Sequence, residues 1–160
     1  MKASCLELAG SKSNMDYRKY GDSIYVRFNR GDEIIKGIME ICKKEKILSA
    51  TYSGIGCCSE VTIASYIPEK NDFFEHRKKG VLELVSLNGN ISADDNDQIY
   101  HHTHALFSYH NEEYKLDSIG GHLIKNTVLY TAEIEIRPVK NGVIRRKNDE
   151  ITGITVWSLK

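Results

Sequence analysis

The sequence predicts an α+β fold in which a largely antiparallel sheet packs against one main helix near the N-terminus. Apolar residues recur at helical spacing in a single segment, close to the start of the chain. The rest of the chain is a series of short runs rich in β-forming residues, separated by turn residues. One helix followed by many strands is typical of a sheet that a helix covers on one face.

The helix is expected at residues 32–46. Ile34, Ile38 and Ile41 fall on one helical face, which predicts that this face is buried. Asp32 is the expected N-cap, because its carboxylate can accept a hydrogen bond from a free backbone N–H of the first turn. Lysines near the end of the segment complement the negative end of the helix dipole.

About eight strands are expected around this helix. The main strand-like runs are residues 23–28, 47–53, 60–66, 73–77, 81–91, 101–109, 127–139 and 154–159. Asn141-Gly142 predicts a two-residue type I′ hairpin between residues 136–139 and 143–146. Gly54 and Gly56 predict a bulge or a tight bend rather than a phosphate-binding loop, because no helix start follows them.

Composition predicts one cytoplasmic domain spanning residues 1–160. This length suits a single domain, and no linker or repeat divides it. No apolar run is long enough to span a bilayer, and the first residues lack the apolar stretch of a signal peptide. The four cysteines, Cys5, Cys42, Cys57 and Cys58, show no C-x-x-C spacing, so we expect reduced thiols that act as small apolar residues.

The charge balance argues against a strongly basic nucleic-acid-binding protein. Twenty-two lysines and arginines offset twenty-two acidic residues, giving a formal net charge of zero. Proteins that gain affinity by neutralising phosphates usually carry a basic excess. Three short basic clusters, at residues 43–46, 77–79 and 145–147, have acidic neighbours and are interpreted as solvated faces. We therefore expect DNA binding that is weak or indirect.

Histidines form the most informative polar pattern. His102 and His104 lie two residues apart on an expected strand, so both side chains project from the same face. Two imidazoles about 7 Å apart at Cβ can converge on one metal ion. The alternative is a pair of solvated or hydrogen-bonded histidines on a half-exposed strand, and the spacing alone leaves both open. Ser53 and Ser86 lack the G-x-S-x-G context of a nucleophile and are interpreted as structural.

Five segments, in order along the chain, resemble the signatures of one known family. They are residues 28–34 (FNRGDEI), 53–56 (SGIG), 82–90 (LELVSLNGN), 102–104 (HTH) and 120–123 (GGHL). Together they resemble the PPC family, the plants and prokaryotes conserved domain, over about residues 22–136. The resemblance implies an α+β fold that assembles as a homotrimer. In plants this domain accompanies AT-hooks in nuclear DNA-binding proteins, but the Arg-Gly-Arg-Pro core of an AT-hook does not occur here.

The resemblance also implies that His122 joins His102 and His104 as the third ligand of a metal ion, with zinc the first candidate for nitrogen ligands. The resulting hypothesis is a homotrimeric binding or assembly module with a three-histidine metal or small-ligand site, and by resemblance a DNA-associated regulator. The alternative is a metal-dependent, hydrolase-like enzyme that uses the open position on the ion. Glu83 and Asp117 are nominated as its general base, without a catalytic assignment.

Overall fold

The computed structural model describes residues 15–70 and 72–159, so Cys5 lies outside the described residues. The elements in chain order are β1 (Asp16–Tyr20), β2 (Ser23–Asn29), α1 (Ile34–Lys44), β3 (Ala50–Ile67), η1 (Pro68–Lys70), β4 (Asp72–Ala93), β5 (Ile99–His110), β6 (Leu116–Pro138), β7 (Arg145–Asn148) and β8 (Thr155–Ser158). Within the described residues, no helix combines the length and the apolar character that crossing a bilayer requires.

The prediction of a helix-packed α+β fold is wrong, because the chain is mostly sheet. The eight strands of the described residues form one sheet, and α1 has only 11 residues. The sheet is mixed, since β4 and β7 pair in parallel between Ala93 and Arg145. Sequence patterns underestimated the strands because glycines and charged residues interrupt the alternation without ending the strand. The runs at residues 47–53 and 60–66, for example, both fall largely within the 18-residue strand β3.

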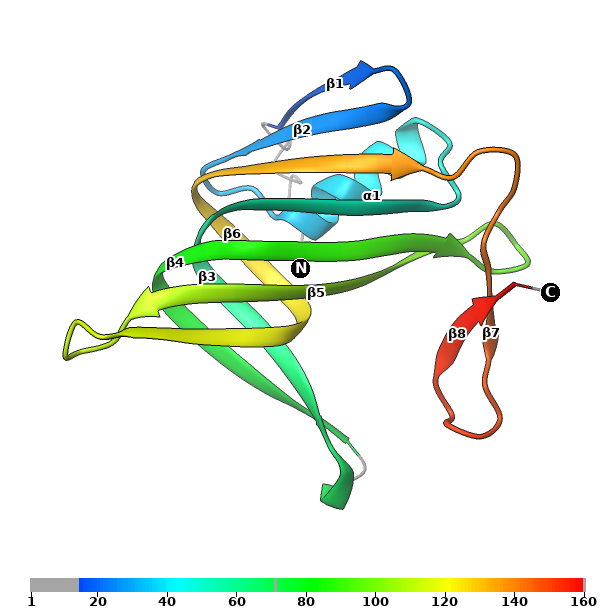
Figure 1. Ribbon diagram of the computed structural model, residues 1–160. Coiled ribbons are helices and arrows are strands. Elements are labelled where there is room, and N and C mark those ends of the chain that lie inside the picture. Colours follow the sequence, from blue (N-terminus) through cyan, green and yellow to red (C-terminus); the bar gives the residue numbers. More distant parts are fainter. Residues whose placement is uncertain (1–14, 71, 160) are drawn as a thin grey trace, which may run out of the picture.

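Four long strands close into a ring that organises the molecule. β3 pairs with β4 and β6, and β5 also pairs with both β4 and β6. The β1–β2 hairpin extends this four-strand ring from β6, and β7 and β8 extend it from β4. Figure 1 shows β3, β4 and β6 bending sharply on the way round. The register of β3 shifts between Gly54 and Gly56, which confirms the predicted bulge at one of these bends.

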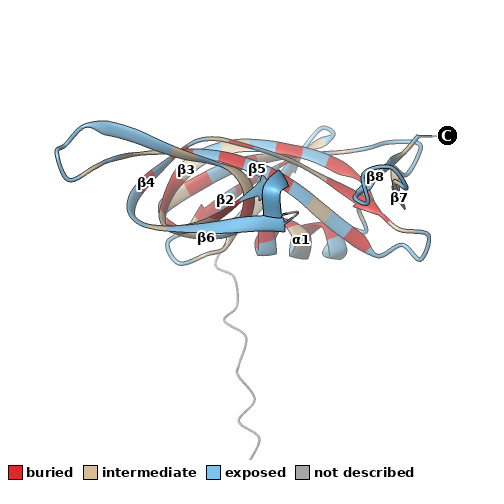
Figure 2. Ribbon diagram, turned by 90° about the horizontal axis from the view of Figure 1, so that it is seen from below, coloured by how far each residue is buried: buried red, intermediate tan, exposed pale blue. Residues whose placement is uncertain are grey.

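Helix α1 covers one face of the sheet beside β2 and β6, as Figures 1 and 2 show. Ile34, Ile38 and Ile41 are buried there with Phe28 of β2, which confirms the predicted apolar face. Burying each such side chain contributes about 1.5–3 kcal/mol. The predicted N-cap is wrong: the Asp32 carboxylate accepts a hydrogen bond from the backbone N–H of Asn29 at 2.8 Å, and the helix begins two residues later.

The predicted hairpin at Asn141-Gly142 is also wrong. β7 pairs with β8 rather than with β6. Ser49 holds the chain on both sides of the connecting loop: its carbonyl accepts a hydrogen bond from Val139 N–H, and its hydroxyl accepts one from Ile144 N–H, both at 2.8 Å. The loop is therefore held against the chain just before β3, and β7 continues away from β6 (Figure 1).

Candidate metal centre

Three histidines from two neighbouring strands converge on one point. β5 supplies His102 and His104, and β6 supplies His122, which lies directly opposite His104. One ring nitrogen from each imidazole lies within 4.8 Å of the other two. The ring centroids are 5.2 to 5.6 Å apart. We call these three residues the histidine triad.

A close approach between β3 and β6 brings His122 to the triad. On its other side, His122 lies opposite Ala64 of β3, so β6 is held between two strands at this residue. Gly121, with φ at +147°, immediately precedes it. A Cβ at Gly121 would stand 2.9 Å from the Ala64 carbonyl oxygen. Glycine is therefore needed here both for the backbone conformation and for the space.

A buried hydrogen-bonded group holds β5 from the inner face of the sheet. Thr103, between the two β5 histidines, is fully buried, and its hydroxyl shares a 2.5 Å hydrogen bond with the Tyr52 hydroxyl. His101 Nδ1 lies 3.1 Å from the same Thr103 oxygen. The Tyr52 ring reaches Thr103 by crossing over Gly89 of β4. This anchoring fixes the part of β5 from which the triad projects.

The surroundings keep His102 and His122 in the neutral form that can bind a metal ion. Burial, and then the neighbouring His104, lower the pKa of His102 below its usual value. Burial and the other two triad residues likewise lower the pKa of His122. A lowered pKa keeps the ring neutral near pH 7 and leaves a nitrogen lone pair free for a cation.

The donor set fits a zinc ion. Zinc binds imidazole nitrogen at about 2.0–2.1 Å, so two nitrogens on one tetrahedral ion lie about 3.3 Å apart. From separations within 4.8 Å, small side-chain rotations close the triad to that spacing. Three protein nitrogens leave a fourth position for water or a ligand, as in catalytic rather than closed structural zinc sites.

No thiol or carboxylate belongs to this group in the part of the chain that the structure describes. Burial raises the pKa of the Cys42 and Cys58 thiols to about 12 and also raises that of Cys57. All three are buried free thiols, as expected of small apolar residues.

The two nominated carboxylates do not join the triad. Glu83 pairs with Ser108 of β5, four residues beyond His104. The Asp117 carboxylate accepts a hydrogen bond from the Tyr109 hydroxyl at 3.4 Å, towards the tip of the β5–β6 hairpin. At about 3.3 Å per residue, both lie well away from the triad along the strands.

Sequence reasoning missed the residues that do share the triad's face. Ala64 lies opposite both His122 of β6 and Glu75 of β4, so these side chains project from the same side of the sheet. Two residues further along, Tyr66 and Phe73 form the next pair on that side. The sequence shows that residues 60–66 alternate as a strand does, but it does not show which strands pair with them.

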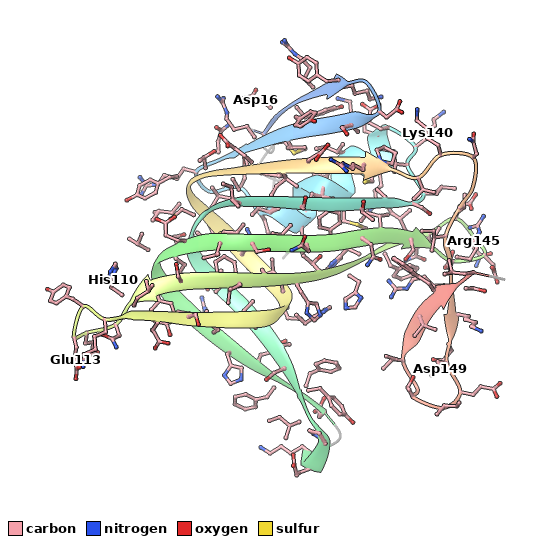
Figure 3. The ribbon with its side chains drawn as sticks, viewed as in Figure 1. Asp16, His110, Glu113, Lys140, Arg145 and Asp149 are labelled. Carbon is pink, nitrogen blue, oxygen red and sulfur yellow. The ribbon has the colours of Figure 1, made fainter. Side chains whose placement is uncertain are left out.

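Two other histidines lie elsewhere and serve as controls. His76 lies opposite Ile63, on the other face of β3 and β4, with its ring 4.8 Å from that of Phe74. His110 ends β5, and Figure 3 places it beside Glu113 towards the tip of the β5–β6 hairpin.

Comparison with known proteins gives one family match and several similar structures. The sequence model of the Plants and Prokaryotes Conserved (PCC) domain matches residues 15–140. A plant- and prokaryote-conserved (PPC) protein from Pyrococcus horikoshii is 32% identical, with a TM-score of 0.73 over 90% of this chain and 94% of the other. No curated protein matches.

Two further structures carry descriptions that concern function. A candidate DNA-binding protein from Bacteroides thetaiotaomicron is 26% identical, with a TM-score of 0.80 over 90% of this chain and 96% of the other. A metal-containing protein from Archaeoglobus fulgidus is also 26% identical, with a TM-score of 0.74 over 92% of this chain and 99% of the other.

Proposed function

Because the chain belongs to the Plants and Prokaryotes Conserved (PCC) domain family, which confirms the resemblance seen in its sequence, we propose that it is a homotrimeric binding module whose histidine triad holds a divalent metal ion. The observation that carries this proposal is the set of three imidazole nitrogens within 4.8 Å of one another. The metal-containing protein from Archaeoglobus fulgidus supports it. Zinc is the first candidate, since all three donors are nitrogens of borderline softness.

Metal analysis of purified variants tests the proposal. After incubation with zinc and dialysis, the wild-type protein should retain about one zinc ion per chain, as measured by elemental (inductively coupled plasma) mass spectrometry. His102→Ala and His122→Ala should lose the ion, because two remaining imidazoles bind weakly. His76→Ala and His110→Ala are matched controls and should retain it. A metal-free wild type, or retention of the ion by both triad variants, would refute the site.

The homotrimer is proposed from family membership and from an exposed apolar surface. Ile55, Val85 and Tyr130 are each at least half exposed. All three line one surface hollow of about 530 Å³ between β3, β4 and β6. Large apolar side chains gathered in this way often mark a protein contact, which a second copy of the chain would cover.

Light scattering on a size-exclusion column tests the assembly. The wild-type mass should be three times the 18.2 kDa of one chain. Tyr130→Asp should release monomers, because it places a charge in the proposed contact. Tyr114→Asp is the control, since Tyr114 is 87% exposed on the β5–β6 loop, away from the hollow. A monomeric wild type would refute the proposal.

A DNA-associated role is the second candidate, favoured by the description of the Bacteroides thetaiotaomicron structure. For this chain we propose that any direct contact is weak. The basic clusters lie on separate elements, at the end of α1, on the projecting part of β4 and on β7. Arg77 and Lys79 form ion pairs with Glu60, which offsets the charge of the second cluster. Fluorescence anisotropy with an A·T-rich duplex should detect only salt-sensitive, non-specific binding; submicromolar affinity at about 0.2 M salt would contradict this.

A further inference from the structure

An exposed aromatic pair stands beside the histidine triad. The rings of Tyr66 and Phe73 lie edge to face, with centroids 5.4 Å apart. Phe73 in turn lies 6.4 Å from His122, centroid to centroid, with the two rings tilted by 46°. Both aromatic side chains are about half exposed, at 50% and 54%. The apolar surface thus continues from the triad onto the projecting β3–β4 hairpin.

The strand register directs this pair to the metal side of the sheet. Tyr66 and Phe73 lie opposite each other, two residues beyond the pair that includes Ala64, and Ala64 lies opposite His122. On this face of β3, the residue before Tyr66 is Ala64, whose side chain is a single methyl group. Gly120, two residues before His122 on β6, adds no side chain to this face. Leu106 of β5 lies opposite Gly120, is 43% exposed and adds an apolar side chain to this face. The space beside the open metal position is therefore bounded by the two aromatic rings, Leu106 and small residues.

We propose that the fourth position of the metal ion takes the anionic head group of a small organic acid whose aromatic ring packs against Phe73 and Tyr66. This inference rests on the proposed metal site and specifies its ligand class. A divalent ion held by three neutral imidazoles retains its full charge, which favours an anionic ligand. Offset or edge-to-face contact with Phe73 adds affinity that an aliphatic acid of the same head group lacks.

A nearby carboxylate narrows the class to acids with one negative group. Glu75 lies on the same face as Phe73, two residues along β4, and is exposed. A second negative group on the ligand ring would be repelled by it. The ligand class is therefore a monoanion with an uncharged aromatic ring.

A pair of zinc-binding probes that differ only in the ring tests the inference. Benzohydroxamate and acetohydroxamate carry the same anionic head group, so calorimetric titration of the zinc-loaded protein with each isolates the ring contribution. Benzohydroxamate should bind more tightly than acetohydroxamate. The ratio of the acetohydroxamate dissociation constant to the benzohydroxamate dissociation constant measures this preference, and Phe73→Ala should reduce that ratio about tenfold. Acetohydroxamate affinity and zinc content should stay unchanged in this variant.

Phe74→Ala is the matched control. Phe74 is the next residue of the same strand and is similarly exposed, at 47%, but its ring packs against His76 on the opposite face. It should leave the ratio unchanged. If the wild type holds no zinc, both the metal site and this inference fail. If zinc is held but Phe73→Ala leaves the ratio unchanged, only this inference fails. The inference also fails if Phe73→Ala dissociates the assembly, because Tyr66 and Phe73 would then form a contact between copies of the chain.

Discussion

Replacing Gly89 with alanine would place a methyl group in the space that the Tyr52 side chain occupies. A Cβ at Gly89 would lie 2.4 Å from two Tyr52 ring carbons and 2.5 Å from the hydroxyl oxygen. Favourable carbon contacts are about 3.5–4.0 Å, so the ring must move by about 1 Å or more. The ring is held in place, because its hydroxyl shares a hydrogen bond with the buried Thr103.

These contacts set the expected loss of stability. Overpacking costs about 1–3 kcal/mol, and a weakened buried hydrogen bond costs about 1 kcal/mol more. Alanine also lowers the conformational entropy of the unfolded chain relative to glycine, which offsets about 0.4–1 kcal/mol of this loss. The unfolding free energy should therefore fall by about 2–3 kcal/mol, and Tm by about 4–12 °C for a domain of this size.

Denaturant and thermal unfolding of the metal-free protein measure the effect, and a second variant tests its cause. In a Tyr52→Ala background the ring is gone, so Gly89→Ala should be close to neutral, giving a coupling of about 2 kcal/mol. Gly142→Ala is the control, since its Cβ would meet nothing within 4 Å, and it should stay within about 0.5 kcal/mol of wild type. An equal loss from Gly89→Ala in both backgrounds would refute the assigned clash.

Two further predictions follow from the pKa values. Because the folded state lowers the pKa of His102 and His122, the unfolded chain binds more protons below about pH 6.5, so the metal-free protein should lose stability as pH falls through the lowered values. In the doubly substituted His102→Gln/His122→Gln protein, Tm should depend less steeply on pH over that range. An unchanged dependence of Tm on pH would contradict the assignment. Burial raises the pKa of Cys42 and Cys58 to about 12, so both should resist iodoacetamide near pH 8 until the protein is denatured, as peptide mass spectrometry would show. Rapid labelling of either residue in the native protein would place it nearer the surface.

Local patterns in the sequence predicted local features of the structure. The spacing of Ile34, Ile38 and Ile41 identified the buried helical face, and the glycines at 54 and 56 identified a bulge. The alternation at His102 and His104 placed both imidazoles on one face. Each of these depends on periodicity within one element, which a single sequence contains.

Features that depend on pairing between distant strands were not predictable from periodicity. The predicted fold class was wrong because the sequence pattern of a bulged strand such as β3 resembles that of two short strands. The closing of the four-strand ring also leaves no local signal in the sequence. The convergence of His122 depends on the β5–β6 register, so it came from family resemblance rather than from spacing. The position of Phe73 beside His122 depends on two successive pairings, β6 with β3 and β3 with β4.

The way the ring closes has a consequence for the order of folding. The triad spans only residues 102–122, within one hairpin, whereas ring closure pairs Ala50 with Pro138 and Ile63 with Leu123. Local hairpins form in about 1–10 μs, while pairing across long sequence separations is slowed by the entropy of loop closure. The hairpin that carries the triad can thus assemble before β3 and β6 meet. An ion bound at that stage would hold the β5–β6 register in place and act as a template on which the rest of the sheet forms.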